Sequence, residues 1–196
     1  MSQVERIAPG LRRWTAWHEE WKDEVGSFAV DTDDGVVLID PIDPPRGLTR
    51  ADHVLITVFW HGRNAADVAG ARVWASKRGA RRLGNRGVKV TEAVEDDELP
   101  GGIRAVPTAR DSEVVYWLPR QKAVVVGDVL LGAGAKPKPT EDPLRLCPER
   151  WLDGNSHDDL RTSLRPLLDL PVQRVLVSHG RPILRGGKKA LSTVLA

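Results

Sequence analysis

The sequence contains very few residues of several types that define whole classes of protein. Among its 196 residues there are one Cys, one Met, two Phe and one Tyr. A single cysteine, Cys147, excludes an internal disulfide framework and any zinc site built from several cysteines. No base neighbours it in the sequence, so we expect a buried structural thiol, and its isolation suits a cytoplasmic location.

Long hydrophobic runs and a strong net charge are also missing. No segment approaches the roughly 18 apolar residues of a membrane span, and the N-terminus has no apolar stretch of signal-peptide length. The 29 basic and 27 acidic residues give a formal net charge of +2. This balance is too even for a dedicated nucleic-acid surface, so we expect a small-molecule substrate or ligand as partner, without nucleic acid or membrane. No pattern predicts an oligomeric state.

The remaining composition suits one globular domain over residues 1–196, because a chain of this length buries roughly 70% of its extended surface on folding. Short β-branched runs predict strands at 28–30, 36–39, 53–58, 88–90, 114–118, 123–126 and 174–177. Helical spacing predicts helices at about 64–70, 74–79, 158–168 and 190–195. Strands buried beneath outer helices indicate a layered α/β architecture.

Local signals refine this outline. Asp33-Asp34-Gly35 predicts a tight hairpin, and residues 118–122 predict another. Residues 132–140 are rich in Gly and Pro and predict an irregular loop, since they lack the Gly-Lys-Ser/Thr ending of a nucleotide-binding loop. Trp14, Trp17 and Trp21 recur at helical spacing, which favours a packing segment or a lid.

Four segments, taken in chain order, resemble the metallo-β-lactamase superfamily and together cover most of the chain. Residues 35–40 (GVVLID) are similar to the strand that ends in Ile-Asp, and 53–57 (HVLIT) to the strand before the His-x-His-x-Asp-His loop. Residues 124–130 (VVVGDVL) are similar to the Gly-Asp-Thr-Leu segment, and 175–180 (VLVSHG) to the closing Gly-His-Gly turn. The resemblance implies an α/β (α+β) fold, the four-layer αββα sandwich, with a site along one edge where strand ends converge.

The resemblance breaks at the metal-binding loop. With Thr57 in register, the four ligand positions of the family are filled by Val58, Trp60, Gly62 and Arg63. A shift of one residue recovers a single histidine, His61. The next family histidine is replaced by Ala109. Because a two-metal hydrolase needs about twice the three protein ligands of a single catalytic zinc, the resemblance implies that a dinuclear site is lost.

Three ligand-type residues survive, and they are the candidates both for catalysis and for metal binding: His61, Asp128 and His179. Two imidazoles and a carboxylate suit at most one ion, zinc or iron, and the missing loop favours no cofactor. The simpler interpretation treats His179 as a hydrogen-bonded turn residue and Asp128 as a paired strand-end carboxylate. In that case Arg63 or Arg110 is expected to pair with Asp128 in place of the metal.

Two functions follow from these alternatives. The first is a hydrolase-like protein that uses at most one metal to activate water against an ester-type or related small substrate. The second is a metal-free binding or regulatory protein, in which a remnant cleft for an anionic small molecule is lined by Trp60, His61, Arg63 and Arg110. A purely structural partner subunit is a third alternative, and it predicts a large exposed apolar patch. His157 precedes an acidic first turn and is expected to begin a helix.

Overall fold

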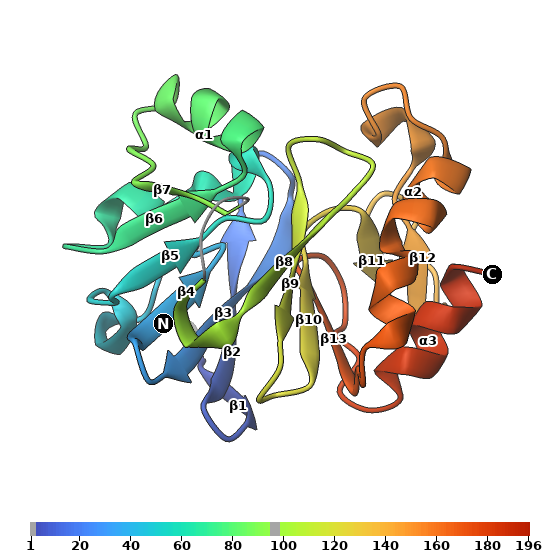
Figure 1. The fold of residues 1–196 in the computed structure, drawn as a ribbon, viewed down its shortest axis with the longest axis horizontal. Helices are drawn as coiled ribbons and strands as arrows, with labels where there is room; N and C mark the ends of the chain where they lie inside the picture. Colours follow the sequence, from blue (N-terminus) through green and yellow to red (C-terminus); the bar gives the residue numbers. More distant parts are fainter. Residues whose placement is uncertain (1–2, 95–98) are drawn as a thin grey trace.

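Two β-sheets pack face to face in the computed structural model, which describes residues 3–94 and 99–196 (Figure 1). The first sheet has the strand order β1 to β7. Its strands are β1 (Glu5–Ala8), β2 (Leu11–His18), β3 (Asp23–Thr32), β4 (Gly35–Ile39), β5 (His53–Leu55), β6 (Arg72–Ala75) and β7 (Glu92–Ala93). Strands β1 to β4 pair antiparallel, whereas β4 to β7 pair parallel.

The second sheet has the order β13, β10, β9, β8. Its strands are β8 (Arg104–Pro107), β9 (Val114–Leu118), β10 (Ala123–Val126) and β13 (Arg174–Val177). Only β10 and β13 pair parallel in this sheet. Strands β11 (Leu130–Gly132) and β12 (Leu144–Leu146) form a separate antiparallel pair.

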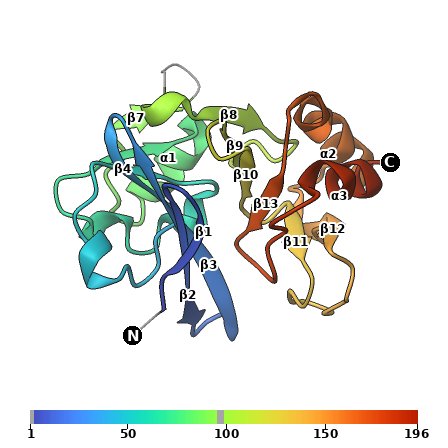
Figure 2. The same cartoon turned by 90° about the horizontal axis from the view of Figure 1, so that it is seen from below.

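In the residues that the structure describes, three α-helices cover the outer faces of the two sheets. Helix α1 (Lys77–Gly84) lies on the side of the first sheet, while α2 (His157–Leu164) and α3 (Gly187–Val194) lie together beside the second (Figures 1 and 2). Short 3-10 helices complete the connections: η1 (Arg46–Leu48), η2 (Phe59–Gly62), η3 (Ala65–Asp67), η4 (Pro100–Gly102), η5 (Glu149–Trp151) and η6 (Arg165–Asp169). The predicted four-layer αββα sandwich is confirmed.

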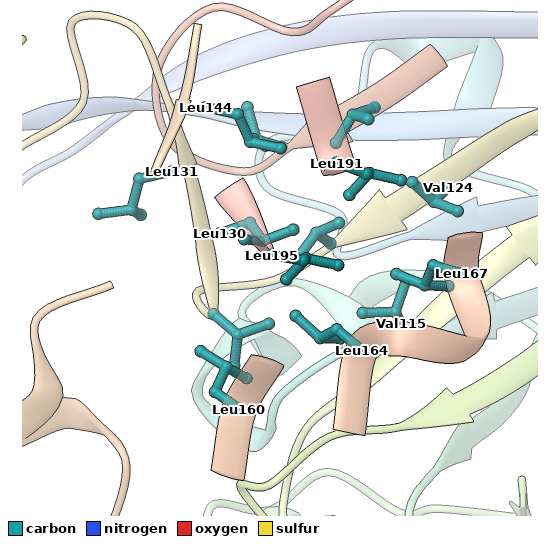
Figure 3. Packing of buried hydrophobic residues seen from close by; sticks show 14 of the residues in the cluster. Val115, Val124, Leu130, Leu131, Leu144, Leu160, Leu164, Leu167, Leu191 and Leu195 are labelled. Atoms are coloured by element: carbon teal, nitrogen blue, oxygen red, sulfur yellow. The ribbon is translucent and has the colours of Figure 1, made fainter. Parts of the chain in front are cut away.

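Alternation along the strands divides the apolar residues between the layers, because successive side chains of a strand point to opposite faces. Ile39 and Leu55 pack between the two sheets, whereas Leu38 and Val54 face α1. The leucines of α2, η6 and α3 pack on the outer face of the second sheet (Figure 3). These clusters hold the loops at the strand ends in fixed positions.

The strongest sequence signals are confirmed. The Asp33-Asp34-Gly35 hairpin joins β3 to β4, and Gly35 has the positive φ of 110° that favours glycine. Residues 118–122 join the antiparallel strands β9 and β10. The helix expected at 158–168 forms as α2 followed by η6, and Pro166 lies where the α-helix gives way to the 3-10 turn.

Several predicted elements are wrong. Residues 64–70 contain only the short turn η3, residues 74–79 divide between β6 and α1, and residues 88–90 form no strand. The segment with Trp14 and Trp17, expected as a packing segment or a lid, is the strand β2. Successive side chains of a strand point to opposite faces, and here Trp14 is buried while Trp17 is 49% exposed. The helical spacing of the tryptophans is therefore coincidental.

Two further expectations concern single features. Ser156 begins α2 with a capping box in which Asp159 is the reciprocal partner, which confirms a helix start at His157. Cys147 is fully buried, and burial, with the nearby Glu113 charge, raises the pKa of its thiol to about 12, as a structural thiol requires. In the described part of the chain, no helix is long and apolar enough to cross a membrane.

Candidate metal centre

Polar side chains from both sheets meet at one edge of the sandwich, where parallel strands end. Asp40 directly follows β4, and His61 lies on η2 a few residues beyond the end of β5. Asp128 follows β10, and His179 follows β13 in the second sheet. All four side chains are buried. Because β4 and β5, and likewise β10 and β13, run parallel, their carboxyl ends bring these loops together.

His61, Asp128 and His179 offer three ligand atoms that lie within 4.8 Å of one another. His61 Nε2 and His179 Nε2 lie 3.1 Å and 3.2 Å from the same oxygen, Asp128 Oδ1. Neither His61 Nε2 nor Asp128 Oδ1 has a partner with hydrogen-bond geometry. Buried polar atoms without partners are rare, so this convergence calls for another group between them.

Each imidazole has a carboxylate at its second nitrogen. His61 Nδ1 donates to Asp40 Oδ2 at 2.8 Å, and His179 Nδ1 lies 3.6 Å from Asp23 Oδ2. A carboxylate accepts and does not donate, so the proton of His61 is held on Nδ1 and Nε2 is left to face the cluster. Metal-ligating histidines are oriented by carboxylates in this way.

Asp40 is fixed by its backbone and by Thr57. Its φ is 49°, and its carboxylate accepts hydrogen bonds from the Thr57 backbone N–H at 2.8 Å and from the Thr57 hydroxyl at 2.5 Å. Its carbonyl accepts from the Ser27 hydroxyl at 2.6 Å. The left-handed backbone is unusual for a residue other than glycine, and such conformations gather at functional sites.

The second oxygen of Asp128 is engaged by an indole. Trp60 Nε1 donates to Asp128 Oδ2 at 2.6 Å. Behind Asp128, Glu113 Oε1 accepts from the backbone N–H groups of Asp128 and Val129, at 2.6 Å and 2.9 Å. A Cβ at Gly127 would lie 2.7 Å from the same Glu113 oxygen, so only glycine permits this close approach.

The pKa values of Asp128 and His179 are displaced in opposite directions. Burial alone would raise the pKa of Asp128, but electrostatic attraction to the His61 and His179 imidazoles, which lie 3.1 Å and 3.2 Å from Oδ1, holds it well below its ordinary value. Burial alone would lower the pKa of His179, yet the Asp128 and Asp23 carboxylates beside its two ring nitrogens stabilise the protonated imidazole and raise the pKa to about 9. Displaced pKa values in a cleft are typical of functional sites.

Arg110 lies behind the cluster and is fully buried. Its Nη1 donates to Glu113 Oε2 at 2.8 Å, its Nη2 donates to the Trp151 carbonyl, and its guanidinium lies 5.0 Å from the Trp60 ring centroid. Burial raises the pKa of Glu113 to about 7 against the opposing effect of Arg110. Two guanidinium nitrogens of the predicted ligand-binding residue Arg110 are thus engaged by protein groups, whereas its buried Nε has no hydrogen-bond partner.

Arg63 points inward but does not pair with Asp128. Its Nη1 donates to the Asp40 carbonyl at 3.4 Å, and its guanidinium lies 5.4 Å from the Trp21 ring centroid. No ion pair joins either Arg63 or Arg110 to Asp128 in residues 3–94 and 99–196, so the arginine–Asp128 pair expected from the sequence is wrong. The Asp128 carboxylate is surrounded instead by two imidazoles and the Trp60 indole. Arg110 forms its ion pair with Glu113.

A pocket of about 620 Å³ opens at the cluster, and Asp128 and His179 form part of its wall. Three indoles also line it, those of Trp21, Trp60 and Trp151. The Trp21 ring lies 5.7 Å from that of His61 and 5.1 Å from that of His179, between centroids. A larger cavity of about 980 Å³ lies by His53 and includes none of the three cluster residues.

The structure brings together His61, Asp128 and His179 as predicted for one site, with Trp60 and Arg63 beside them. Sequence reasoning missed the carboxylates that position this set: Asp23, Asp40 and Glu113. The signal for Asp40 was present, since it ends the buried strand in the Ile-Asp pattern. Nothing local marks Asp23 or Glu113, because Asp23 reaches the site from the start of β3 and Glu113 from the residue just before β9.

Comparison with known proteins identifies the fold. No protein-family profile matches the sequence, and no curated protein matches it. Among solved structures, a metallo-β-lactamase from Erythrobacter litoralis, with β-mercaptoethanol in its active site, superimposes with a TM-score of 0.72 at 14% identity, over 99% of this chain and 94% of that one. The mono-zinc form of FIM-1 from Pseudomonas aeruginosa gives 0.67 at 13% identity, over 99% and 94%.

A flavo di-iron protein mutant from Thermotoga maritima gives a TM-score of 0.60 at 17% identity, over 100% of this chain and 61% of that one. Likeness at these identities establishes architecture, since one scaffold supports many sites. The chain has the metallo-β-lactamase fold.

Proposed function

We propose that this chain is a hydrolase-like protein whose site holds one divalent metal ion through His61 Nε2, Asp128 Oδ1 and His179 Nε2. The observation that carries the proposal is the convergence of these three atoms, two of which lack hydrogen-bond partners. Two imidazoles and one carboxylate form a donor set that suits zinc and equally suits iron. The Asp40 and Asp23 carboxylates behind the two rings support the same assignment.

The donor set supports one ion and not two. In the described residues, these three are the one cluster of His, Cys, Asp or Glu side chains able to hold a cation. The remaining oxygen of Asp128 accepts a hydrogen bond from Trp60. A dinuclear hydrolase needs further ligands and a group that bridges both ions.

Bound there, a zinc or iron ion supplies Lewis-acid chemistry, which polarises an ester-type bond and makes water a better nucleophile. The residues of the chain orient the ligand atoms. Asp40 keeps the His61 proton on Nδ1, and the side chains of all three ligand residues are buried. The pocket that Asp128 and His179 line is large enough to give a small substrate access to these two residues.

A second candidate function is metal-free binding of an anionic small molecule. It is favoured by Arg63, whose buried Nε and Nη2 atoms both lack hydrogen-bond partners. Burial lowers the pKa of the Arg63 guanidinium, although nearby Asp40 and Asp128 oppose this. Two adjacent N–H donors match the geometry of a carboxylate or phosphate.

Metal analysis decides between the two candidates. Protein prepared without chelator is analysed for zinc, iron and manganese, beside an Asp128→Asn variant as matched control. The proposal predicts about one equivalent in the wild type and a large loss in the variant. Well under one equivalent in both, after incubation with each metal, contradicts it.

A thermal-shift screen with small carboxylates and phosphates tests the alternative. A ligand at 100 times its Kd adds about 2.7 kcal/mol to stability, which raises the melting temperature measurably. An Arg63→Met variant should lose that shift. Equal shifts in both proteins would exclude the Arg63 site.

A further inference from the structure

The second oxygen of Asp128 faces a network that contains no metal ligand. Trp60 Nε1 reaches Asp128 Oδ2 at 2.6 Å, a short distance for an N–H donor. An indole nitrogen donates and does not accept, so it cannot bind a cation. Asp128 is therefore asymmetric: Oδ1 faces two imidazoles, and Oδ2 faces a permanently protonated nitrogen.

The Trp60 ring is backed by a fixed positive charge. The Arg110 guanidinium lies 5.0 Å from its centroid, within the range of a cation–π contact. A cation on the ring face withdraws electron density from the indole and makes its N–H a stronger donor. Arg110 is fully buried, so water does not screen this effect as it does at a surface.

The same guanidinium also determines the backbone of Asp128. Arg110 Nη1 pairs with Glu113 Oε2, while Glu113 Oε1 accepts the backbone N–H of Asp128. Arg110 thus acts on Asp128 by two routes, through the indole to the side chain and through Glu113 to the main chain. A buried network in which each member holds the next is a means of pre-organising a site.

We infer that Trp60, polarised by Arg110, takes the place of a second cation at Asp128 and restricts this carboxylate to one metal ion through Oδ1. Trp60 is then a positioning residue, and Arg110 with Glu113 positions both it and Asp128. The inference rests on the proposed single-metal function for its consequence. The hydrogen bond itself exists without any metal, so it can be tested separately.

The direct test is the indole N–H spectrum of metal-free, ¹⁵N-labelled protein. The chain has seven Trp, so seven indole signals are expected, and Trp60→Phe identifies one of them. We expect that signal far downfield and protected from exchange. Asp128→Asn should move it upfield and leave the Trp74 signal, identified by Trp74→Phe, unchanged. A Trp60 signal at an ordinary position that does not respond to Asp128→Asn would overturn the inference.

Zinc affinity, measured by competition with a chelating dye, tests the consequence. Loss of an outer partner typically lowers metal affinity by 10–100-fold, and we expect this range for Trp60→Phe. Trp74→Phe removes another buried indole donor, whose partner His53 is not part of the cluster, and should leave the affinity unchanged. An unchanged zinc affinity in Trp60→Phe would refute the positioning role, because the proposal requires the affinity to fall when the indole is removed.

Arg110 is tested with the double variant Arg110→Gln/Glu113→Gln, which removes both charges and retains groups that can hydrogen-bond. We expect the Trp60 indole signal to move upfield relative to the wild type, because the ring loses its cation. A folded double variant with an unmoved signal would contradict the role of Arg110. If the wild type binds no zinc yet shows the downfield signal, the proposed function fails while the Trp60–Asp128 assignment stands.

Discussion

Two buried histidines each lie beside a tryptophan, His53 at the start of strand β5 and His61 on η2 beyond the end of that strand, and they differ in what surrounds the ring. At the start of the strand, His53 Nδ1 accepts from Trp74 Nε1 at 3.2 Å. Beyond its end, His61 Nδ1 donates to Asp40 at 2.8 Å, and its Nε2 faces Asp128 without a hydrogen-bond partner. The Nδ1 atom of His53 is occupied by the Trp74 indole, whereas the Nε2 atom of His61 remains available to another group.

The comparison shows that a buried histidine and an indole do not by themselves make a site. His53 lines the larger cavity, but no cluster of three ligand-type side chains includes it in the described residues. At the other end, the indole of Trp60 binds a carboxylate and leaves the imidazoles to the cluster. The number of unsatisfied ligand atoms distinguishes the two ends, and cavity volume does not.

The largest effect is expected from His61→Ala. This change removes one of three ligands, so zinc affinity should fall by more than the 10–100-fold that a lost outer partner costs. His53→Ala is the matched control at the other end of β5 and should retain wild-type affinity. Equal losses in the two variants, measured by dye competition, would abolish the distinction between the ends.

A large loss of stability is expected from Glu113→Ala. Breaking a buried ion pair by removing one partner costs about 3–5 kcal/mol, because Arg110 is left buried without its carboxylate. Glu19→Ala removes an exposed pair with Lys22 and should change stability by at most about 1 kcal/mol. Urea denaturation measures both. A Glu113→Ala loss as small as that of Glu19→Ala would show that the pair is not structural.

The pH dependence of the metal-free protein should show His179. The folded pKa is raised from 6.5 to about 9, so protonated His179 stabilises the fold fully below pH 6.5. This contribution, up to about 3 kcal/mol, is lost as the pH rises through about 9. Glu113, whose pKa is raised to about 7, loses its contribution between pH 4.5 and 7, which leaves the window from 7 to 9 to His179.

Urea unfolding of wild type and His179→Asn at pH 7 and pH 9 measures the effect. The wild type should lose stability over this interval, and the variant should lose less. The same loss in both proteins would assign the pH dependence to another group.

The smallest effect is expected from Trp74→Phe. The change removes the hydrogen bond to His53, which is worth about 1 kcal/mol of stability. Thermal unfolding should record this modest loss. A loss of several kcal/mol would mean that the His53 end of β5 is as strongly constrained as the His61 end.

The sequence predicted the layers of the fold and the identity of the three clustered residues better than it predicted individual helices. Runs such as 123–126 and 175–177 are apolar and rich in β-branched valine, so the sequence indicated their strands directly. The strand β2 was missed because Trp14, Trp17 and Trp21 coincide with helical spacing. Its actual register is fixed by pairing with β3, which no local pattern reveals.

The surroundings of the site were harder to predict for the same reason. Asp128 was expected to pair with an arginine, but Glu113 lies closer to Arg110 and engages it. That partnership depends on how residues 108–113 lead into β9, which is a tertiary feature. The role of Trp60 as a donor to Asp128 joins residues 68 apart in the chain and was equally invisible.

The most direct test of the account is a crystal structure of zinc-soaked protein with anomalous data collected on both sides of the zinc edge. We expect one anomalous peak, bounded by His61 Nε2, Asp128 Oδ1 and His179 Nε2, with the Trp60 indole still on Asp128 Oδ2. Two peaks that share the Asp128 carboxylate, or no peak between the two imidazoles at saturating zinc, would contradict it.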